Sequence, residues 1–210
     1  MTKKFRNKYR IASARMQNWD YGSNAAYFIT ICTQDRICFF GQVQNGEMKY
    51  NESGQMANTI WMKIPQQFPY AELGDFVVMP NHFHGILIIN KSPVQPRLLD
   101  SKTQPRLITQ KVQTRLIASQ RSLSLKESGG ITGNKNPMLH DNISRIIRWY
   151  KGRCTYEIRK ANPAFGWQPR FYDHIIRNNI SYQRKAKYIR NNPKNWHEDK
   201  LNSGSFTINH

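Results

Sequence analysis

Two histidines stand two positions apart inside an otherwise apolar segment, residues 77–89. His82 and His84 flank Phe83 and follow Met79-Pro80-Asn81. Alternate side chains of a strand share a face, so both imidazoles should point the same way. Buried imidazoles need polar partners, and a divalent metal ion suits a pair of them. Two hydrogen-bonded core histidines would give the same pattern, so a second motif has to decide between these interpretations.

A tyrosine and an asparagine near the other end of the chain have helical spacing. Residues 179–192 place Ala186 and Ile189 on one apolar face and precede a proline. Tyr188 and Asn192 should then lie one turn apart on the same side of a helix. A nucleophilic hydroxyl and an amide oxygen would face one target together. A core tyrosine beside a C-cap asparagine is the alternative.

Together these motifs resemble those of the single-tyrosine HUH transposases, and particularly the REP-associated tyrosine transposases. The histidine, bulky hydrophobe, histidine motif is followed downstream by Tyr-x-x-x-Asn, as in that family. Further stretches that are similar to the family lie at residues 19–21, 27–33, 151–153, 167–177 and 192–196. The resemblance covers most of residues 19–196, apart from one insert.

The resemblance implies a DNA transposase that cleaves and rejoins single-stranded DNA beside hairpins. His82, His84 and Asn192 would hold Mg²⁺ or Mn²⁺ against the scissile phosphate. Tyr188 would attack the phosphate, giving a 5′-phosphotyrosine and a free 3′-hydroxyl. No nucleotide cofactor is expected, since no P-loop or dinucleotide glycine motif occurs. We expect Lys185 or Lys187 to lower the pKa of the Tyr188 hydroxyl.

The composition favours a polyanionic partner. The chain has 32 Lys and Arg residues against 13 Asp and Glu, a formal net charge of +19. The candidate DNA contacts are Arg145, Arg148, Lys151, Arg153, Arg170, Arg177, Arg184 and Lys185. Trp149 and Trp167 could stack on bases, although packing in the core explains buried tryptophans at least as well.

Membrane insertion, secretion and a disulfide framework are not expected. The longest apolar run near His84 is too short to span a bilayer. The basic N-terminal segment lacks the apolar stretch of a signal peptide, so we expect a cytoplasmic protein. The three cysteines, Cys32, Cys38 and Cys154, form no CxxC pair, so we expect them to be reduced thiols.

The order of expected elements predicts an α+β fold. The elements are a strand at 26–33, a hairpin at 41–51, a helix capped by Ser53, strands at 75–79 and 82–90, a helix from 142, a strand at 170–177 and a helix at 179–192. This is the ferredoxin-like (RRM-like) plan, an antiparallel sheet with helices on one side, plus an extra C-terminal helix that carries the tyrosine. The His82 strand should be central, with the last helix across its other side. RNA-recognition modules share this fold, so the site must decide the function.

We expect one HUH transposase domain at residues 21–196, preceded by a basic arm at 1–20 and followed by a tail at 197–210. An insert at 91–137 interrupts the domain and contains three copies of a nine-residue unit, beginning at Val94, Thr103 and Val112. The unit is shorter than most solenoid repeats and is polar and basic, which indicates a surface loop. A tolerated insertion is the preferred interpretation, and a basic flap that touches DNA is the alternative.

Three alternative functions use the same residues. A replication-initiator or relaxase-like HUH nuclease would nick DNA for another purpose. A non-catalytic nucleic-acid-binding descendant would keep the residues without turnover. A metal-dependent hydrolase that uses water would not need Tyr188. The sequence is compatible with a monomer or a homodimer.

Overall fold

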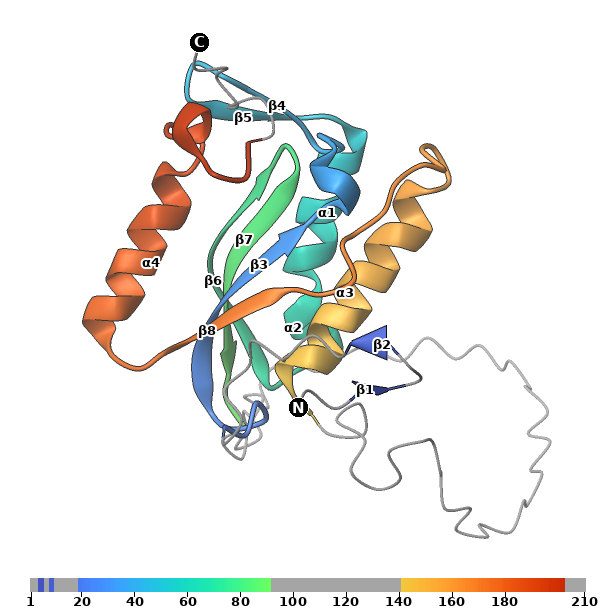
Figure 1. Cartoon of the computed structure of the whole chain (residues 1–210). Coiled ribbons are helices and arrows are strands. Elements are labelled where there is room, and N and C mark those ends of the chain that lie inside the picture. The colour runs from blue at the N-terminus through green and yellow to red at the C-terminus, as the bar shows by residue number, and fades with distance from the viewer. Residues whose placement is uncertain (1–3, 6–7, 10–18, 92–140, 203–210) are drawn as a thin grey trace, which may run out of the picture. The chain divides into compact units, whose positions relative to one another are not determined.

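Four antiparallel strands form the central sheet of the structure, a computed structural model that describes residues 4–5, 8–9, 19–91 and 141–202 (Figure 1). The strands are β3 (Ala25–Cys32), β6 (Ala71–Met79), β7 (His82–Ile89) and β8 (Tyr172–Ile176). Their order is β6-β7-β3-β8, so β7 is an inner strand and β8 an edge strand. The predicted central position of the His82 strand is confirmed.

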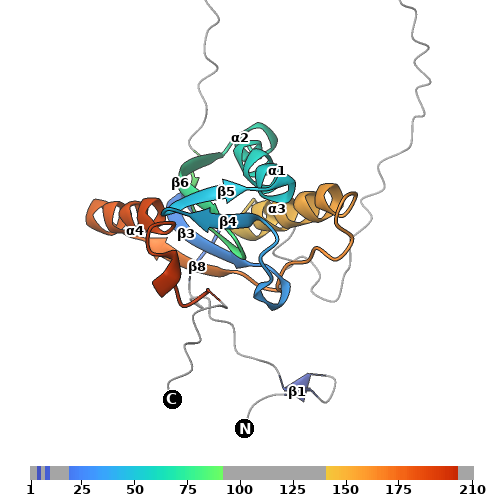
Figure 2. The same ribbon diagram turned by 90° about the horizontal axis from the view of Figure 1, so that it is seen from above.

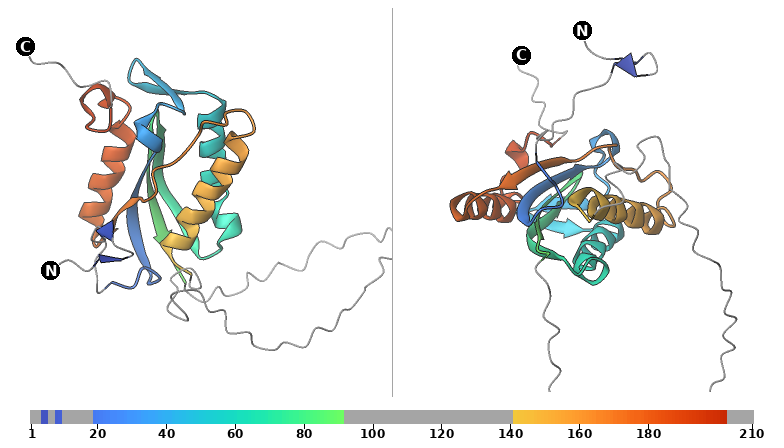
Figure 3. Two further views of the ribbon diagram at one scale, coloured as in Figure 1. Left: turned by 45° about the vertical axis from the view of Figure 1, so that its right-hand side comes forward. Right: turned by 90° about the horizontal axis from the view of Figure 1, so that it is seen from below.

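Helices cover both faces of this sheet. One face carries α1 (Glu52–Met62), α2 (Ile64–Gln67) and α3 (Ile143–Ile158), and the other carries α4 (Asn179–Asn191) (Figures 1 and 2). Figure 3 shows the sheet between α4 and the pair α1 and α3. The predicted α+β fold is confirmed, including the extra C-terminal helix that carries the tyrosine.

The remaining elements are short. The hairpin predicted around Asn45-Gly46 is confirmed as β4 (Gly41–Gln44) paired with β5 (Glu47–Tyr50). Two 3₁₀ turns cover Gln34–Arg36 and Trp196–Glu198. Near the N-terminus β1 (Lys4–Phe5) pairs with β2 (Lys8–Tyr9). The three nine-residue repeats and most of the predicted N-terminal arm lie outside the described residues. In the described part of the chain, no helix is both long and apolar enough to cross a membrane.

Strand alternation divides the interior into two hydrophobic clusters. Phe83 and Leu87 of β7 join the larger cluster, which contains Trp61 of α1 and Tyr150 of α3. The neighbouring positions of β7 face the other way, and Ile86 joins a smaller cluster under α4. The predicted apolar face of α3 is confirmed, since Ile143, Ile146, Ile147, Tyr150 and Ile158 are all buried. The sheet therefore separates α4 from the larger hydrophobic cluster.

The predicted cap of α1 is wrong. The N-cap is Asn51 rather than Ser53, and its side-chain oxygen accepts a hydrogen bond of 3.0 Å from the Gly54 amide. Asn51 also donates to the Phe39 carbonyl at 3.0 Å. One amide side chain can both accept and donate, so Asn51 joins the helix start to the preceding loop in a way that a serine inside the first turn cannot.

Two glycines in helices should respond in opposite ways to alanine. A Cβ on Gly54 would lie 2.1 Å from the Phe40 carbonyl oxygen, whereas a Cβ on Gly152 would meet no described atom within 4 Å. We expect Gly54→Ala to destabilise the protein by about 2 kcal/mol or more. Gly152→Ala, the matched control in an exposed helix position, should stabilise it by about 0.5–1 kcal/mol. Urea unfolding measures both, and equal changes would contradict the close approach of α1 to the Phe40 loop.

Candidate active site

Strand β7 places His82 and His84 side by side on the sheet face that α4 covers. The ring centroids are 4.5 Å apart, and the side chains are 0% and 3% exposed. Ile86, two residues further along the same face, packs with Ala186 and Ile189 of α4. The two imidazoles therefore share a face, as the strand pattern predicts, and they are buried.

Hydrogen bonds fix the orientation of both rings. His82 Nδ1 lies 2.9 Å from Asn81 Oδ1, which can only accept, so Nδ1 carries the proton and Nε2 keeps its lone pair. His84 Nδ1 lies 2.8 Å from the Thr30 hydroxyl. His82 Nε2 is buried and has no hydrogen-bond partner among the described residues. An unpartnered buried nitrogen acceptor of this kind fits a metal ligand.

Burial keeps both imidazoles neutral at neutral pH. Loss of hydration lowers the pKa of His82 to about 4, and the nearby Arg36 adds to this effect against the opposing charge of Asp199. Loss of hydration also holds the pKa of His84 well below its usual value, with further contributions from His82 and Lys185. A neutral imidazole is the form that binds a metal, so no proton has to be removed first.

A carboxylate completes a group that can bind a metal ion. One ligand atom each from His82, His84 and Asp199 lie within 4.8 Å of one another. Asp199 follows the 3₁₀ turn after α4, and its Oδ1 accepts a hydrogen bond of 2.7 Å from the Leu201 amide. Asp199 was not among the residues predicted from the sequence, because no periodic pattern or motif marks the segment that carries it.

Asn192 adjoins this group at the end of α4. The side chain is 2% exposed, and its Nδ2 donates to Asp199 Oδ2 at 2.9 Å. Its Oδ1 is buried without a hydrogen-bond partner in the described part of the chain. Two orphaned acceptors, His82 Nε2 and Asn192 Oδ1, thus accompany a carboxylate. This mixed nitrogen and oxygen donor set fits a divalent cation such as Mn²⁺ or Mg²⁺.

Asn81 connects the two halves of the group. The residue is 0% exposed, and its Oδ1 faces His82 Nδ1. Its Nδ2 donates to the Leu201 carbonyl at 2.7 Å and to the Arg36 carbonyl at 3.1 Å. The same side chain therefore sets the orientation of His82 and holds the segment that presents Asp199. Asn81 acts as a positioning residue for the candidate site.

Helix α4 brings Tyr188 to the edge of this group. Its hydroxyl lies 3.4 Å from His84 Nε2, and the side chain is 45% exposed. Burial, followed by the charge of Asp199, raises the pKa of Tyr188, while Asn192 opposes the shift. The expectation that Lys185 or Lys187 lowers this pKa is therefore wrong. Lys185 instead lies over the Phe28 ring, 4.5 Å from its centroid.

The eight predicted DNA contacts fall into two groups on opposite sides of the sheet. The α3 group consists of Arg145, Arg148, Lys151 and Arg153, with Arg170 in the following loop. The α4 group consists of Arg184 and Lys185 on α4, the helix that covers the histidine face, and Arg177 in the turn that precedes this helix. Some of the α3 group already have protein partners: Arg153 pairs with Glu157 at 2.9 Å, and Lys151 donates to the Gln168 carbonyl. Among the eight predicted contacts, Lys185 is the one whose charge acts on His84 of the candidate metal group.

The two tryptophans predicted as possible base-stacking residues pack against the larger hydrophobic cluster. Trp149 lies edge-on to Phe68, with centroids 5.7 Å apart. Trp167 contacts Phe40 and Phe165, each with centroids 5.3 Å apart. These contacts account for both residues without DNA.

Comparison with known proteins identifies one related sequence of nearly full length. A protein of Haemophilus influenzae, described as uncharacterized, is 33% identical over 191 residues, which cover 90% of this chain and 91% of that protein. The chain belongs to the same family as this protein. No family model matches the chain.

A solved structure shares the fold of this chain. It is a REP-associated tyrosine transposase bound to a REP hairpin, with a TM-score of 0.51 and 19% sequence identity. The match covers 88% of this chain and 74% of that one. At this identity the likeness establishes the fold alone.

Metal binding should depend on Asp199 as well as on the histidines. We expect Asp199→Asn and His82→Gln each to weaken Mn²⁺ binding by about 10- to 100-fold or more, because each loses one donor of the group. Isothermal titration calorimetry measures the affinity. Asp35→Asn removes an exposed carboxylate elsewhere and should leave the affinity unchanged. Equal affinities of Asp199→Asn and the wild type would rule out Asp199 as a ligand.

The metal-free protein should lose stability in mild acid. The pKa of His82 is about 4 when folded and near 6.5 when unfolded, so the unfolded state binds more protons between these values. The free energy of unfolding should hold above pH 6.5 and fall by about 3 kcal/mol as the pH drops towards 4. Urea unfolding with EDTA measures this at each pH. His82→Gln should show a smaller loss, and identical pH profiles would contradict the buried neutral imidazole.

Proposed function

We propose that the chain is a DNA transposase of the single-tyrosine HUH type, related to the REP-associated tyrosine transposases. In this proposal it cleaves and rejoins single-stranded DNA beside hairpins. One observation carries the proposal: the Tyr188 hydroxyl lies 3.4 Å from His84 Nε2, at the edge of a buried group that can bind a metal ion. A structural core tyrosine would not need to be half exposed beside two neutral imidazoles and a carboxylate.

The residues that would hold Mg²⁺ or Mn²⁺ are His82, His84 and Asp199, with the Asn192 oxygen as a further donor. Their chemistry fits such an ion, because the imidazoles are neutral and the Asn192 oxygen lacks a partner in the described structure. A bound divalent ion would supply Lewis-acid activation of the scissile phosphate and would offset the charge of Asp199. Asn81 and Thr30 keep the two rings oriented for this role.

The proposed reaction is a transesterification at phosphorus. The Tyr188 oxygen attacks, the bond from phosphorus to the 3′ oxygen breaks, and a 5′-phosphotyrosine forms. The phenolic proton passes to solvent, which reaches the half-exposed side chain, and the leaving 3′ oxygen takes up a proton. One phosphodiester replaces another, so the 3′-hydroxyl of a strand can reverse the step without a nucleotide cofactor.

The proposed partner is single-stranded DNA with hairpins. Lys185 of the α4 group acts on His84, and this group would contact the strand near the cleaved bond. The α3 group lies across the sheet and would contact a more distant part of the same DNA. We also propose the organisation expected from the sequence, with one catalytic domain at residues 21–196, and a cytoplasmic location.

A denaturing gel tests the proposed nucleophile. The protein is incubated with Mn²⁺ and single-stranded DNA from the flanks of its own gene, and a protein-DNA adduct is sought. We expect the adduct with wild type and none with Tyr188→Phe, because phenylalanine lacks the attacking oxygen. Tyr182→Phe changes another tyrosine of α4 and should keep the adduct.

Other results would contradict the proposal. Cleavage that persists in Tyr188→Phe would indicate a metal-dependent hydrolase that uses water. DNA binding without cleavage by the wild type would indicate a non-catalytic nucleic-acid-binding protein.

A further inference from the structure

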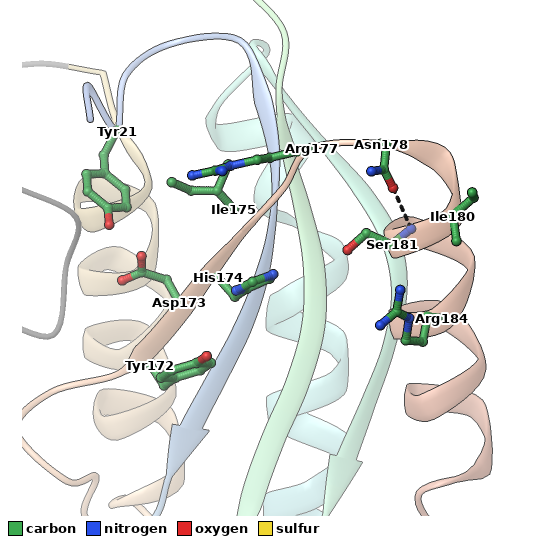
Figure 4. Close-up of a pocket in the computed structure, with 10 residues that line it drawn as sticks. All are labelled: Tyr21, Tyr172, Asp173, His174, Ile175, Arg177, Asn178, Ile180, Ser181 and Arg184. Atoms are coloured by element: carbon green, nitrogen blue, oxygen red, sulfur yellow. Dashed lines mark hydrogen bonds between the residues drawn. The ribbon is translucent and has the colours of Figure 1, made fainter. Parts of the chain in front are cut away.

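A pocket of about 690 Å³ lies where the edge strand β8 meets the start of α4 (Figure 4). Tyr172 and His174 come from β8, and Arg184 extends from α4 towards them. Arg177 lies in the turn between the two elements. The volume falls within the range of pockets that bind small ligands, and a single nucleotide is of that size.

The strand register places Tyr172 and His174 of this pocket on the same sheet face as the candidate active site. Tyr172 of β8 pairs with Thr30 of β3, and Thr30 pairs with His84 of β7. Directly paired residues point to the same face, so Tyr172 and His84 are two strands apart on one surface. Neighbouring strands are about 4.8 Å apart, which makes this separation roughly 10 Å. About three stacked nucleotides cover such a distance.

Positive charge runs from the site to the pocket. Lys185 lies over the Phe28 ring, which stacks on His84, and Phe28 pairs with His174 of β8. The charge of Lys185 therefore acts on both histidines. Arg177 acts on His174 as well, and Arg184 acts on Lys185. Asp173 is the one carboxylate among the residues that line the pocket. A row of like charges on one surface is favourable where a polyanion binds along it.

The pocket also offers uncovered apolar surface. Tyr172 is 52% exposed, and Ile180 is 74% exposed on the first turn of α4. An exposed aromatic ring beside arginines is the combination that binds an unpaired base and its phosphate. The Tyr172 ring has a partly free face for such a base, unlike Trp149 and Trp167, which pack against the core.

We propose that this pocket seats one unpaired nucleotide of the DNA strand that passes through the active site. Its base stacks on Tyr172, and Arg177 and Arg184 hold the adjacent phosphates. This inference rests on the proposed function, because it assigns the path of the same substrate. A base inside a duplex is stacked and paired on both sides and cannot enter the pocket, so the pocket selects single-stranded DNA.

The test compares binding of single-stranded and double-stranded DNA by fluorescence anisotropy. The probes are labelled oligo-dT and a duplex of equal length, with EDTA present and Tyr188→Phe as the parent protein, so that no cleavage can occur. We expect Tyr172→Ala to weaken single-strand binding by about tenfold and to leave duplex binding unchanged. Tyr172→Phe keeps the ring and should bind like the parent. Arg184→Gln should reduce the salt dependence of single-strand binding by about one phosphate contact.

Tyr156→Ala is the matched control, since Tyr156 is 62% exposed but lies on α3. It should bind single strands like the parent. Photocrosslinking with 5-iodouracil in the strand provides a second readout, and we expect the crosslinked peptide to contain Tyr172. Equal effects of Tyr172→Ala on both forms of DNA, or crosslinks confined to α3, would overturn the proposal.

The result of this binding test can be interpreted separately from the test for the Tyr188 adduct. If the Tyr172 effect is absent while wild type still forms a Tyr188 adduct, the pocket assignment is wrong and the proposed function stands. If the Tyr172 effect is present without any adduct, the pocket binds single strands and the proposed covalent reaction is wrong.

Discussion

The alternation of side chains along β7 is the constraint on which the rest of the structure depends. An inner strand is covered on both faces, so Phe83 and Leu87 must meet the main core while His82 and His84 must be buried on the other side. Two buried imidazoles without water need partners or a ligand. Asn81 and Thr30 satisfy one nitrogen of each ring. The remaining nitrogens are directed to the place where α4 and the following turn bring Tyr188, Asn192 and Asp199 together.

The charges on the two faces of the sheet differ in their effect on the candidate site. Burial keeps the histidines neutral, so the charge near the candidate site comes from Asp199, Arg36 and Lys185. Burial and then the negative charge of Asp199 raise the pKa of Tyr188 in the metal-free protein. A divalent cation held by Asp199 would offset that negative charge, so the same carboxylate would couple cation binding to the reactivity of the tyrosine. The α3 cations lie across the sheet and leave this balance untouched.

Local patterns predicted much of this arrangement, and contacts between distant segments account for what they missed. Period two in residues 82–89 and helical spacing around Tyr188 fixed which residues share a face, and both predictions are confirmed in the geometry. Asp199 carries no such pattern, and its segment is held by bonds from Asn192 to Asp199 and from Asn81 to the Leu201 carbonyl, which is 120 residues from Asn81 in sequence. The start of α1 was misplaced for a similar reason, since Asn51 is fixed by a bond to Phe39 in another loop. The direction of the Tyr188 pKa shift also depended on burial and on Asp199, which the neighbouring lysines in the sequence did not reveal.

The most direct test of this account is a crystal structure with Mn²⁺, using anomalous scattering to locate the ion. We expect one strong anomalous peak within bonding distance of His82 Nε2, a nitrogen of His84 and a carboxylate oxygen of Asp199, with Tyr188 beside it. The same map would show whether the Asn192 oxygen is a fourth donor. A protein saturated with Mn²⁺ in which this position stays empty, or in which the ion binds elsewhere, would contradict the central claim that β7 and the end of α4 build a metal site for the tyrosine.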